Sequence, residues 1–322
     1  MNISILGCGR WASFHAWYQS KILNNSTLVW GLGDSQTFKD ISTTRKNDYL
    51  TLPDSVEFTA DLASAINFSD YIIISISAQA MPEFSREIAK HKPMNKTFVL
   101  CMKGIIDSTG ERLSEVLSRE INESNKITVW VGPGHVQEFI KGNPNIMLVD
   151  GTDEKSVDDV ISKFKSKLIR FYKGDDLIGA EIGAAAKNVV GIIAGILDGA
   201  NRTSLKGALM ARGIYEVARL IVALGGKMLT AYGVSHLGDF EATLFSKNSQ
   251  NRRYGESFYK GVRCDYLAEG IATSKALHLL ATQHKVEMPI SNLCYQILHE
   301  GKDIQEGFRE LFERDNVKEF RF

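Results

Sequence analysis

The chain has few of the residues and patterns that mark several classes of protein. Its four cysteines lie far apart and form no CxxC motif, so neither a zinc cluster nor a disulfide framework is indicated, and we expect no metal. The 38 Lys and Arg residues equal the 38 Asp and Glu residues, without blocks of one sign, so charge favours neither nucleic acid nor an acidic membrane as a partner. The N-terminal apolar run is too short for a signal sequence and has no basic leader, and we expect a cytoplasmic protein.

One apolar stretch, residues 178–199, is about as long as the ~20 residues that span a bilayer. Glu181, Lys187, Asn188 and Asp198 interrupt it, and the remainder is rich in Gly and Ala rather than Leu. A charge near the centre of a spanning helix costs at least ~2.5–3.5 kcal/mol. We therefore predict a buried helix of a globular domain and no integral membrane span.

The first half of the 322 residues alternates short apolar runs with amphipathic stretches. Residues 71–76, YIIISI, are β-branched and almost entirely apolar, which is typical of a strand buried on both faces. Strands that alternate with helices form βαβ units, so this half predicts a doubly wound α/β domain with a parallel sheet. The predicted strands are 3–6, 28–30, 71–76, 97–102, 128–131, 146–149 and 168–171, and the predicted helices are 12–23, 81–90 and 111–124.

From about Asp176 the pattern changes to long helical periods, and no strand candidate of comparable quality follows. The predicted helices are 177–199, 203–224, 265–285 and 289–300, with a Gly- and polar-rich stretch over 233–261. A chain of 322 residues fits two globular domains of about 100–200 residues each. We therefore expect an α/β domain over 1–176 and an all-helical C-terminal domain over 177–322.

Residues 7–12, GCGRWA, follow the first predicted strand directly and form a GxGxxA motif. Gly7 permits a tight turn, Gly9 lets the backbone approach a pyrophosphate, and the small Ala12 lets the helix pack on the strand. The start of that helix, at Arg10 and Trp11, offers unpaired N–H groups to the phosphates. In this context the motif predicts a Rossmann-like dinucleotide-binding domain, with a purely structural turn as the alternative.

The acidic residue expected about 20 positions further on is Asp34, which follows the second predicted strand. It is placed to bind the 2′-hydroxyl of an adenosine ribose, and a carboxylate there favours NAD over NADP because it repels a 2′-phosphate. Lys39 and Arg45 follow closely enough to keep NADP open. A solvated turn residue is the alternative.

Two further candidates stand at predicted strand ends, where parallel strands face a ligand crevice. Lys103, in CMKG, is well placed to meet a substrate there, although a strand-end lysine is more often a surface charge. In residues 132–138, GPGHVQE, the glycines Gly132 and Gly134 suit a loop pressed against a ligand, or a plain turn.

Lys187 lies on a glycine-striped helix. Gly183, Lys187, Gly191 and Gly195 recur every four residues and share one face. Glycine inside a helix costs about 0.5–1 kcal/mol relative to alanine, so the stripe needs a reason. Close helix packing is one reason, and room for a ligand around an amine is the other. Partial desolvation lowers the pKa of a lysine toward values useful in acid–base catalysis.

Two polar segments follow in the second half. Asp239, in LGDF, is placed to orient a catalytic lysine and hold its proton, and Thr243 comes one helical turn later. The NRRYG sequence at 251–255 combines Asn and Arg with glycine, which suits recognition of a phosphate or carboxylate. In isolation such a sequence is more often a solvated loop.

Taken in order, these motifs resemble the NAD(P)-dependent sn-glycerol-3-phosphate dehydrogenases of the bacterial type. The resemblance covers nearly the whole chain, from GCGRWA through KG, GPGHVQE, GAAAKNVVGIIAGILDG and LGD to NRRYG, AEGIATSKA and VEMPI. It implies a Rossmann-like domain followed by a helical domain, a homodimer, and NAD or NADP as cofactor; Asp34 slightly favours NAD. It also implies interconversion of dihydroxyacetone phosphate and glycerol 3-phosphate for phospholipid synthesis.

The resemblance implies roles for single residues as well. Lys187 matches the acid–base lysine, Lys103 the second active-site lysine, and Asp239 the acid that holds Lys187, while Glu269 matches an acid near the cofactor's adenosine half. The implied substrate-binding residues are Lys103, Gly132, Gly134, Asn188, Thr243, Ser249, Gln250 and Asn251. The implied cofactor-binding residues are Gly7, Gly9, Arg10, Trp11, Ala12, Asp34, Lys103, Val136, Gln250 and Glu269.

The chain departs from the family pattern at several positions. Gln250 stands where the family usually has an Arg that helps bind phosphates, and Arg252, Arg253 and Lys206 are candidates to replace that charge. Arg10 stands where Ser or Asn is usual, Gly134 replaces a small or hydroxyl residue, and His236 replaces the glycine of GLGD. These changes leave open a related dehydrogenase that acts on another hydroxy acid or phosphorylated hydroxy compound. A non-catalytic cofactor-binding sensor is disfavoured because both lysines are present.

Overall fold

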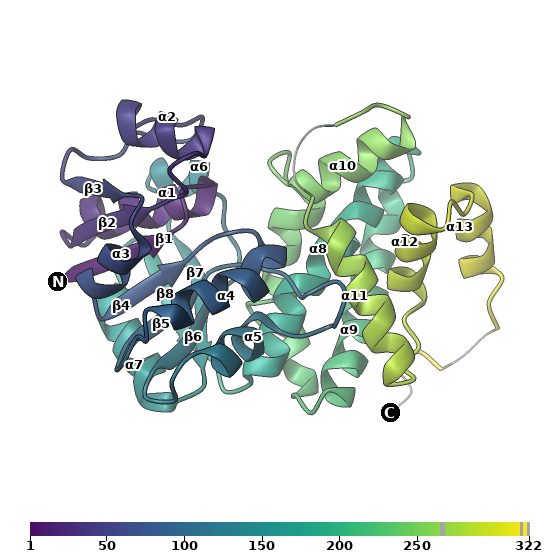
Figure 1. The fold of residues 1–322 in the computed structure, drawn as a ribbon. Coiled ribbons are helices and arrows are strands. Elements are labelled where there is room, and N and C mark those ends of the chain that lie inside the picture. Colours follow the sequence, from purple (N-terminus) through teal and green to yellow (C-terminus); the bar gives the residue numbers. More distant parts are fainter. Residues whose placement is uncertain (265–267, 316–317, 321–322) are drawn as a thin grey trace.

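A computed structural model describes residues 1–264, 268–315 and 318–320. The N-terminal half forms one β-sheet covered by helices, and the C-terminal half is helical (Figure 1). The last strand ends at Lys173, and a 23-residue helix, α8 (Leu177–Gly199), begins four residues later at the centre of the helical half.

The sheet has eight strands in the order β3-β2-β1-β4-β5-β6-β7-β8. The first six strands in this order run parallel, in the 3-2-1-4-5-6 arrangement of dinucleotide-binding domains, so the predicted Rossmann-like class is confirmed. The strands are β1 (Asn2–Leu6), β2 (Ser26–Trp30), β3 (Val56–Thr59), β4 (Tyr71–Ile74), β5 (Thr97–Leu100), β6 (Lys126–Val131), β7 (Asn145–Gly151) and β8 (Ile169–Lys173).

One part of the sheet differs from the predicted parallel arrangement. Strand β7 pairs with β6 in the antiparallel direction, and β8 then runs parallel to β7. The segment between β6 and β7 holds just the five-residue helix α6 (Val136–Ile140). A parallel return needs a crossover of a dozen or more residues that usually includes a full helix, so this connection brings the chain back the other way.

Both faces of the sheet are buried. Along β4, Ile73 belongs to the apolar core on one face, while Ile72 and Ile74 belong to the core on the other. This alternation explains why the strand is apolar at every position. The covering helices are α1 (Arg10–Trp17), α2 (Gln36–Thr44), α3 (Leu62–Phe68), α4 (Met81–Lys90), α5 (Leu113–Glu120) and α7 (Glu154–Phe164).

Helix α8 is the core of the helical half. It is long and apolar enough to cross a membrane, but 89% of its most apolar window is buried inside the protein, as predicted. Isoleucines and valines along α8 belong to the core that the surrounding helices share. These helices are α9 (Lys206–Ala223), α10 (Gln250–Tyr259), α11 (Gly270–Gln283), α12 (Pro289–His299) and α13 (Ile304–Phe312).

Some elements were missed or predicted with other bounds. The predictions omitted α2, β3, α3, α6, α7, α10 and α13, and the predicted helix over 265–285 begins at Gly270, with residues 265–267 outside the described part. Helix α10 lies within the stretch expected to be Gly-rich and polar, and it packs closely on α8. Its contacts with α8 stabilise a segment whose own sequence gives little helical signal.

Candidate active site

The glycine loop after β1 has the geometry that its motif requires. Gly7 has φ +126°, and a Cβ there would lie 2.2 Å from the carbonyl oxygen of Ser75. Gly9 precedes α1 without a side-chain cap, and its own Cβ position meets open space. Ala12 is fully buried under the loop, where it packs the helix on the sheet. The start of α1 therefore offers uncapped backbone N–H groups to a ligand.

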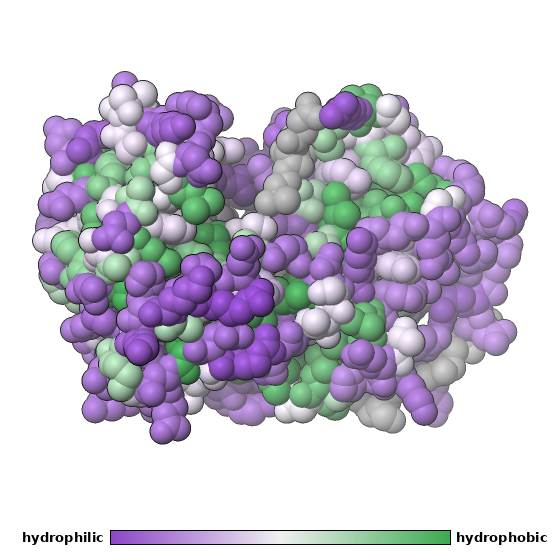
Figure 2. All heavy atoms as spheres, viewed as in Figure 1, coloured by the Kyte–Doolittle hydropathy of each residue, from purple (hydrophilic) through white to green (hydrophobic). Residues whose placement is uncertain are grey.

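A cavity of about 1150 Å³ lies at the carboxyl ends of the parallel strands. The segments that follow β1, β2, β4, β5 and β6 line its sheet side, and residues of α8, the 239–251 segment and Glu269 line its helical side. Figure 2 shows a notch between the sheet half and the helical half of the molecule. The cavity includes the point between β1 and β4 where the strand order reverses, which is where open α/β sheets bind ligands.

Two lysines meet one carboxylate inside this cavity. The Lys187 Nζ lies 2.8 Å and the Lys103 Nζ 2.7 Å from the same Asp239 oxygen, Oδ2. Lys187 also donates to the Thr243 hydroxyl (2.9 Å), and Lys103 donates to the carbonyl of Gly132 (2.6 Å). The side chains of Asp239, Lys187 and Lys103 are 2%, 8% and 13% exposed, so the three charges form a largely buried cluster.

The environment of Lys187 suits proton transfer. Burial, together with the Lys103 charge, lowers its pKa to about 8, although the Asp239 carboxylate opposes both effects. Thr243 donates its own hydrogen to the Asp239 carbonyl (2.7 Å), so it accepts from the lysine. An ammonium has three hydrogens, and these two contacts leave one for a ligand.

A chain of amide hydrogen bonds joins the elements around the lysines. Asn188 donates to the carbonyl of Lys103 (2.9 Å) and accepts from Asn251 (2.9 Å). Asn251 in turn accepts from the backbone N–H of Gly270 (2.9 Å). These contacts connect the β5 end, α8, α10 and α11, and hold them around the cavity.

The glycine stripe of α8 serves close packing. A Cβ at Gly195 would lie 1.9 Å from the carbonyl oxygen of Arg252, and one at Gly255 would lie 2.0 Å from that of Ile192. A Cβ at Gly191 would meet Thr243 at 2.8 Å. The stripe therefore brings α10 and the 239–245 segment against α8, which places their polar side chains beside Lys187.

The structure brings most of the candidate residues together but leaves three outside the cavity lining. The candidates that line the cavity are Gly7, Gly9, Arg10, Trp11, Lys103, Gly134, Val136, Lys187, Asn188, Asp239, Thr243, Ser249, Gln250, Asn251 and Glu269. Ala12 lies beneath the loop, and Gly132 reaches the site through its carbonyl. Asp34 is exposed in the turn before α2, while Leu32 and Ser35 line the cavity nearby.

The cations proposed to replace the family's arginine at position 250 face elsewhere. Arg252 pairs with Asp198 at 2.6 Å, and the buried Lys206 pairs with the same oxygen at 2.7 Å. Neither residue, nor Arg253, is among the residues that line the cavity. His236, at the position of the family's glycine, is fully buried and makes a 2.7 Å contact with the carbonyl of Gly183, and burial lowers its pKa to about 4.

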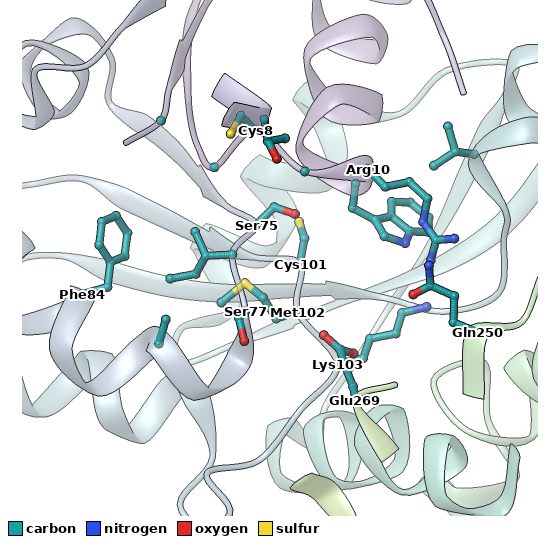
Figure 3. Close-up of a pocket in the computed structure, with 18 of the residues that line it drawn as sticks. Cys8, Arg10, Ser75, Ser77, Phe84, Cys101, Met102, Lys103, Gln250 and Glu269 are labelled. Carbon is teal, nitrogen blue, oxygen red and sulfur yellow. The ribbon is translucent and has the colours of Figure 1, made fainter. Parts of the chain in front are cut away.

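Several residues that line the cavity were not predicted from the sequence. Ser75 and Ser77 follow β4, and Figure 3 shows them with Met102 around the cavity. His135 also lines the cavity and makes a hydrogen bond of 2.9 Å with the carbonyl of Ala242, and burial lowers its pKa. The rule that parallel strands end at the ligand crevice would have selected Ser75 and Ser77 from the predicted strand 71–76.

The fold and the site define a class of protein. A glycine loop at the strand-order reversal, joined by a cavity to a buried lysine with a lowered pKa, is the arrangement of an NAD(P)-dependent oxidoreductase that acts on a CH–OH group.

The comparisons with known proteins identify the family. Models described as the NAD-dependent glycerol-3-phosphate dehydrogenase N-terminus and C-terminus match residues 2–157 and 176–309. The chain is 34% identical over 330 residues to a protein named glycerol-3-phosphate dehydrogenase [NAD(P)+] from Thermoanaerobacter sp. (strain X514), covering 99% of both chains. The chain belongs to the NAD-dependent glycerol-3-phosphate dehydrogenase family.

Other relatives agree. A protein of the same name from Enterococcus faecalis (strain ATCC 700802 / V583) is 32% identical, with 100% of this chain and 98% of the relative covered. A crystal structure of glycerol-3-phosphate dehydrogenase from Coxiella burnetii has a TM-score of 0.91 and 27% identity, covering 97% of this chain and 99% of that chain. The fold and both halves of the chain therefore match the family.

Proposed function

We propose that the chain catalyses the NAD(P)-dependent interconversion of dihydroxyacetone phosphate and sn-glycerol 3-phosphate. The observation that carries the proposal is the buried cluster of Lys187, Lys103 and Asp239 in a chain that matches this family over nearly its whole length. A carbonyl oxygen that gains negative charge during reduction is stabilised by such preorganised hydrogen-bond donors.

The residues that surround the cavity fit a nicotinamide dinucleotide. The uncapped start of α1 and the tight turn at Gly7 suit the pyrophosphate. The volume of about 1150 Å³ accommodates a dinucleotide together with a small substrate. When bound, the nicotinamide supplies the hydride in one direction and accepts it in the other. The proposed cofactor residues are Gly7, Gly9, Trp11, Lys103, Val136, Gln250 and Glu269, together with Arg10 through its backbone N–H at the start of α1.

Lys187 is the proposed acid and base of the reaction. In reduction it donates a hydrogen bond to the substrate carbonyl and then gives its proton to the developing alkoxide, a role typically worth ~10²–10⁴-fold in rate. Its pKa of about 8 lies near a neutral working pH, so it releases and regains the proton readily. Asp239 and Thr243 fix the direction of the amine through their contacts with its nitrogen.

Lys103 is the proposed second donor. Its contacts to Asp239 and to the carbonyl of Gly132 occupy two of its three hydrogens, and the third is available to a substrate oxygen. Asn188 and Asn251 already share a hydrogen bond with each other and so position the substrate from a preformed network. Ser249 and Gly134 complete the proposed substrate-binding set.

We also propose a domain division, a cellular location, an oligomeric state and a physiological role for this protein, each as expected from its family. The proposed division is a dinucleotide-binding domain over 1–176 and a helical substrate-binding domain over 177–322, in a cytoplasmic homodimer. The proposed physiological role is the supply of glycerol 3-phosphate for phospholipid synthesis. Light scattering on the purified protein tests the proposed dimer. The expected molar mass is about twice the 35.8 kDa of one chain.

Initial rates of NADH and NADPH oxidation with dihydroxyacetone phosphate test the proposed function, with Lys187→Met as the matched blank. We expect turnover within the usual enzyme range of roughly 1–10³ s⁻¹ for the wild type and its loss in the variant, with NADH affinity retained. Undiminished turnover in Lys187→Met refutes the role of the lysine. If the wild-type protein binds the cofactor tightly but shows no turnover, dihydroxyacetone phosphate is not its substrate, and other hydroxy compounds should be tested.

A further inference from the structure

Within the described part of the chain, the charges that line the cavity leave one cation without an ion pair. Among the described residues, the lysine and arginine side chains that line it are Arg10, Lys103 and Lys187. The two lysines share a single oxygen of Asp239, at 2.7 and 2.8 Å, so that carboxylate offsets part of their charge. Arg10 makes no ion pair or side-chain hydrogen bond with any described part of the chain.

The Arg10 side chain is held in place by its contact with an aromatic ring, and its side-chain N–H groups remain available to a ligand. Arg10 is the first residue of α1, and its guanidinium carbon lies 5.5 Å from the centre of the Tyr49 ring. A guanidinium stacked on an aromatic ring is oriented through its face, which leaves the five N–H donors at its edge for a ligand. Burial raises the pKa of Glu269, and the Arg10 charge is among those that oppose the rise, so Arg10 acts electrostatically across the cavity.

Arg10 extends toward the position where the family's arginine is missing. Figure 3 shows its side chain reaching from the glycine loop toward Gln250, with Lys103 directed into the same space. Gln250 is the first residue of α10 and carries no charge. Both departures from the family pattern, an arginine gained at position 10 and one lost at position 250, therefore lie in the lining of the same cavity.

We infer that Arg10 binds the phosphate group of the substrate, supplying from the sheet side the charge that relatives carry on the helical side at position 250. The inference rests on the proposed function, because it assumes a phosphorylated substrate. A guanidinium carries a positive charge and binds two phosphate oxygens at once, whereas the amide of Gln250 carries no charge. The phosphate is then held between α1 and α10, so that substrate binding joins the two halves of the molecule.

Exchange of the two side chains tests this inference. The variants are Arg10→Ser, Gln250→Arg and the double variant, with Arg170→Ser as control because Arg170 is an exposed arginine on β8 outside the cavity. The main readout is the calorimetric Kd of sn-glycerol 3-phosphate for the NADH-saturated protein, which needs no turnover. The second readout is the Kd of NADH, followed by its fluorescence.

We expect Arg10→Ser to weaken glycerol 3-phosphate binding by about 10- to 100-fold, the usual effect of losing a charged hydrogen bond. The double variant should recover most of this loss, and Arg170→Ser should have no effect. The kcat/KM preference for dihydroxyacetone phosphate over unphosphorylated dihydroxyacetone should fall by a similar factor in Arg10→Ser. NADH affinity should change less than threefold.

Two results overturn the inference. Weaker NADH binding in Arg10→Ser, with glycerol 3-phosphate affinity at saturating NADH unchanged, assigns Arg10 to the cofactor's pyrophosphate. Failure of Gln250→Arg to restore binding in the double variant refutes the exchange of charge between the two positions. Thermal melting checks that the variants are folded, and Arg10→Gln replaces Arg10→Ser if the latter melts early. Failure of the proposed function has a different signature, because the wild type would then neither turn over nor bind glycerol 3-phosphate.

Discussion

The shared carboxylate of Asp239 predicts opposite pH shifts for two single substitutions. Burial and the Lys103 charge lower the pKa of Lys187 to about 8, and Asp239 works against them. In Asp239→Asn the opposing charge is lost, so the pKa of Lys187 falls. In Lys103→Met the like charge is lost, so the pKa rises.

The size of each shift follows from the distances. An opposite charge within ~4–6 Å changes a pKa by about 1–3 units, and the contact here is 2.8 Å. Because the asparagine amide still accepts a hydrogen bond, we expect the lower end, a fall of about one to two units in Asp239→Asn. The Lys103 ammonium contacts the same oxygen at 2.7 Å, and its loss should raise the pKa by on the order of one unit.

The assay is the pH dependence of kcat/KM for dihydroxyacetone phosphate reduction, which reports the free enzyme's acid. Lys187 must be protonated to act as the acid, so the wild-type rate should fall as pH rises through about 8. The fall should move to lower pH in Asp239→Asn and to higher pH in Lys103→Met. Profiles that coincide, or that both move the same way, refute the electrostatic argument, provided that melting and NADH binding show both variants folded.

Three further outcomes are expected. Gly195→Ala should lower the free energy of unfolding by several kcal/mol, because its Cβ would lie 1.9 Å from a carbonyl oxygen of α10. Gly207→Ala on α9 should instead raise the free energy of unfolding by about 0.5–1 kcal/mol, because the added Cβ meets open space. Urea denaturation measures both changes, and equal effects contradict the packing argument. Leu32→Arg should improve kcat/KM for NADPH relative to NADH about tenfold, because Leu32 lines the cavity after β2 and is 60% exposed, so a guanidinium there can pair with the 2′-phosphate of NADPH. An unchanged ratio of rates places the ribose elsewhere. Asn251→Ala should reduce kcat/KM at least ~10-fold in steady-state assays, since two hydrogen bonds are lost, and full activity would show the amide chain to be dispensable.

The strongest local patterns predicted their elements well. The strand 71–76 is apolar at nearly every position because both faces of β4 are covered, and the glycine loop follows β1 as its motif requires. Helix α10 was missed because its sequence, QNRRYGESFY, is polar and contains an interior glycine. That glycine is what allows α10 to approach α8, so the feature that weakens the helix locally is the one that packs it.

The direction of strand β7 could not be predicted from the sequence pattern either. Alternation and apolar content predicted a strand near 146–149, but neither depends on which way the strand runs. The short connection after β6 decides this, and its consequence appears once the chain is folded. The ribose contact of Asp34 remains a prediction, since the residue is exposed in the turn before α2 and is not among the residues that line the cavity.

The sequence by itself determined the class of fold, the family, and the lysines and aspartate at the centre of the site, because each belongs to a local pattern with a defined spacing. Tertiary structure decided how these residues meet. A carboxylate shared by Lys103 and Lys187, an arginine that reaches toward Gln250, and a glycine stripe used for packing all join segments far apart in the chain. Local spacing specifies the elements, whereas burial, charge balance and close contact arise only when α8, α10 and the strand ends come together.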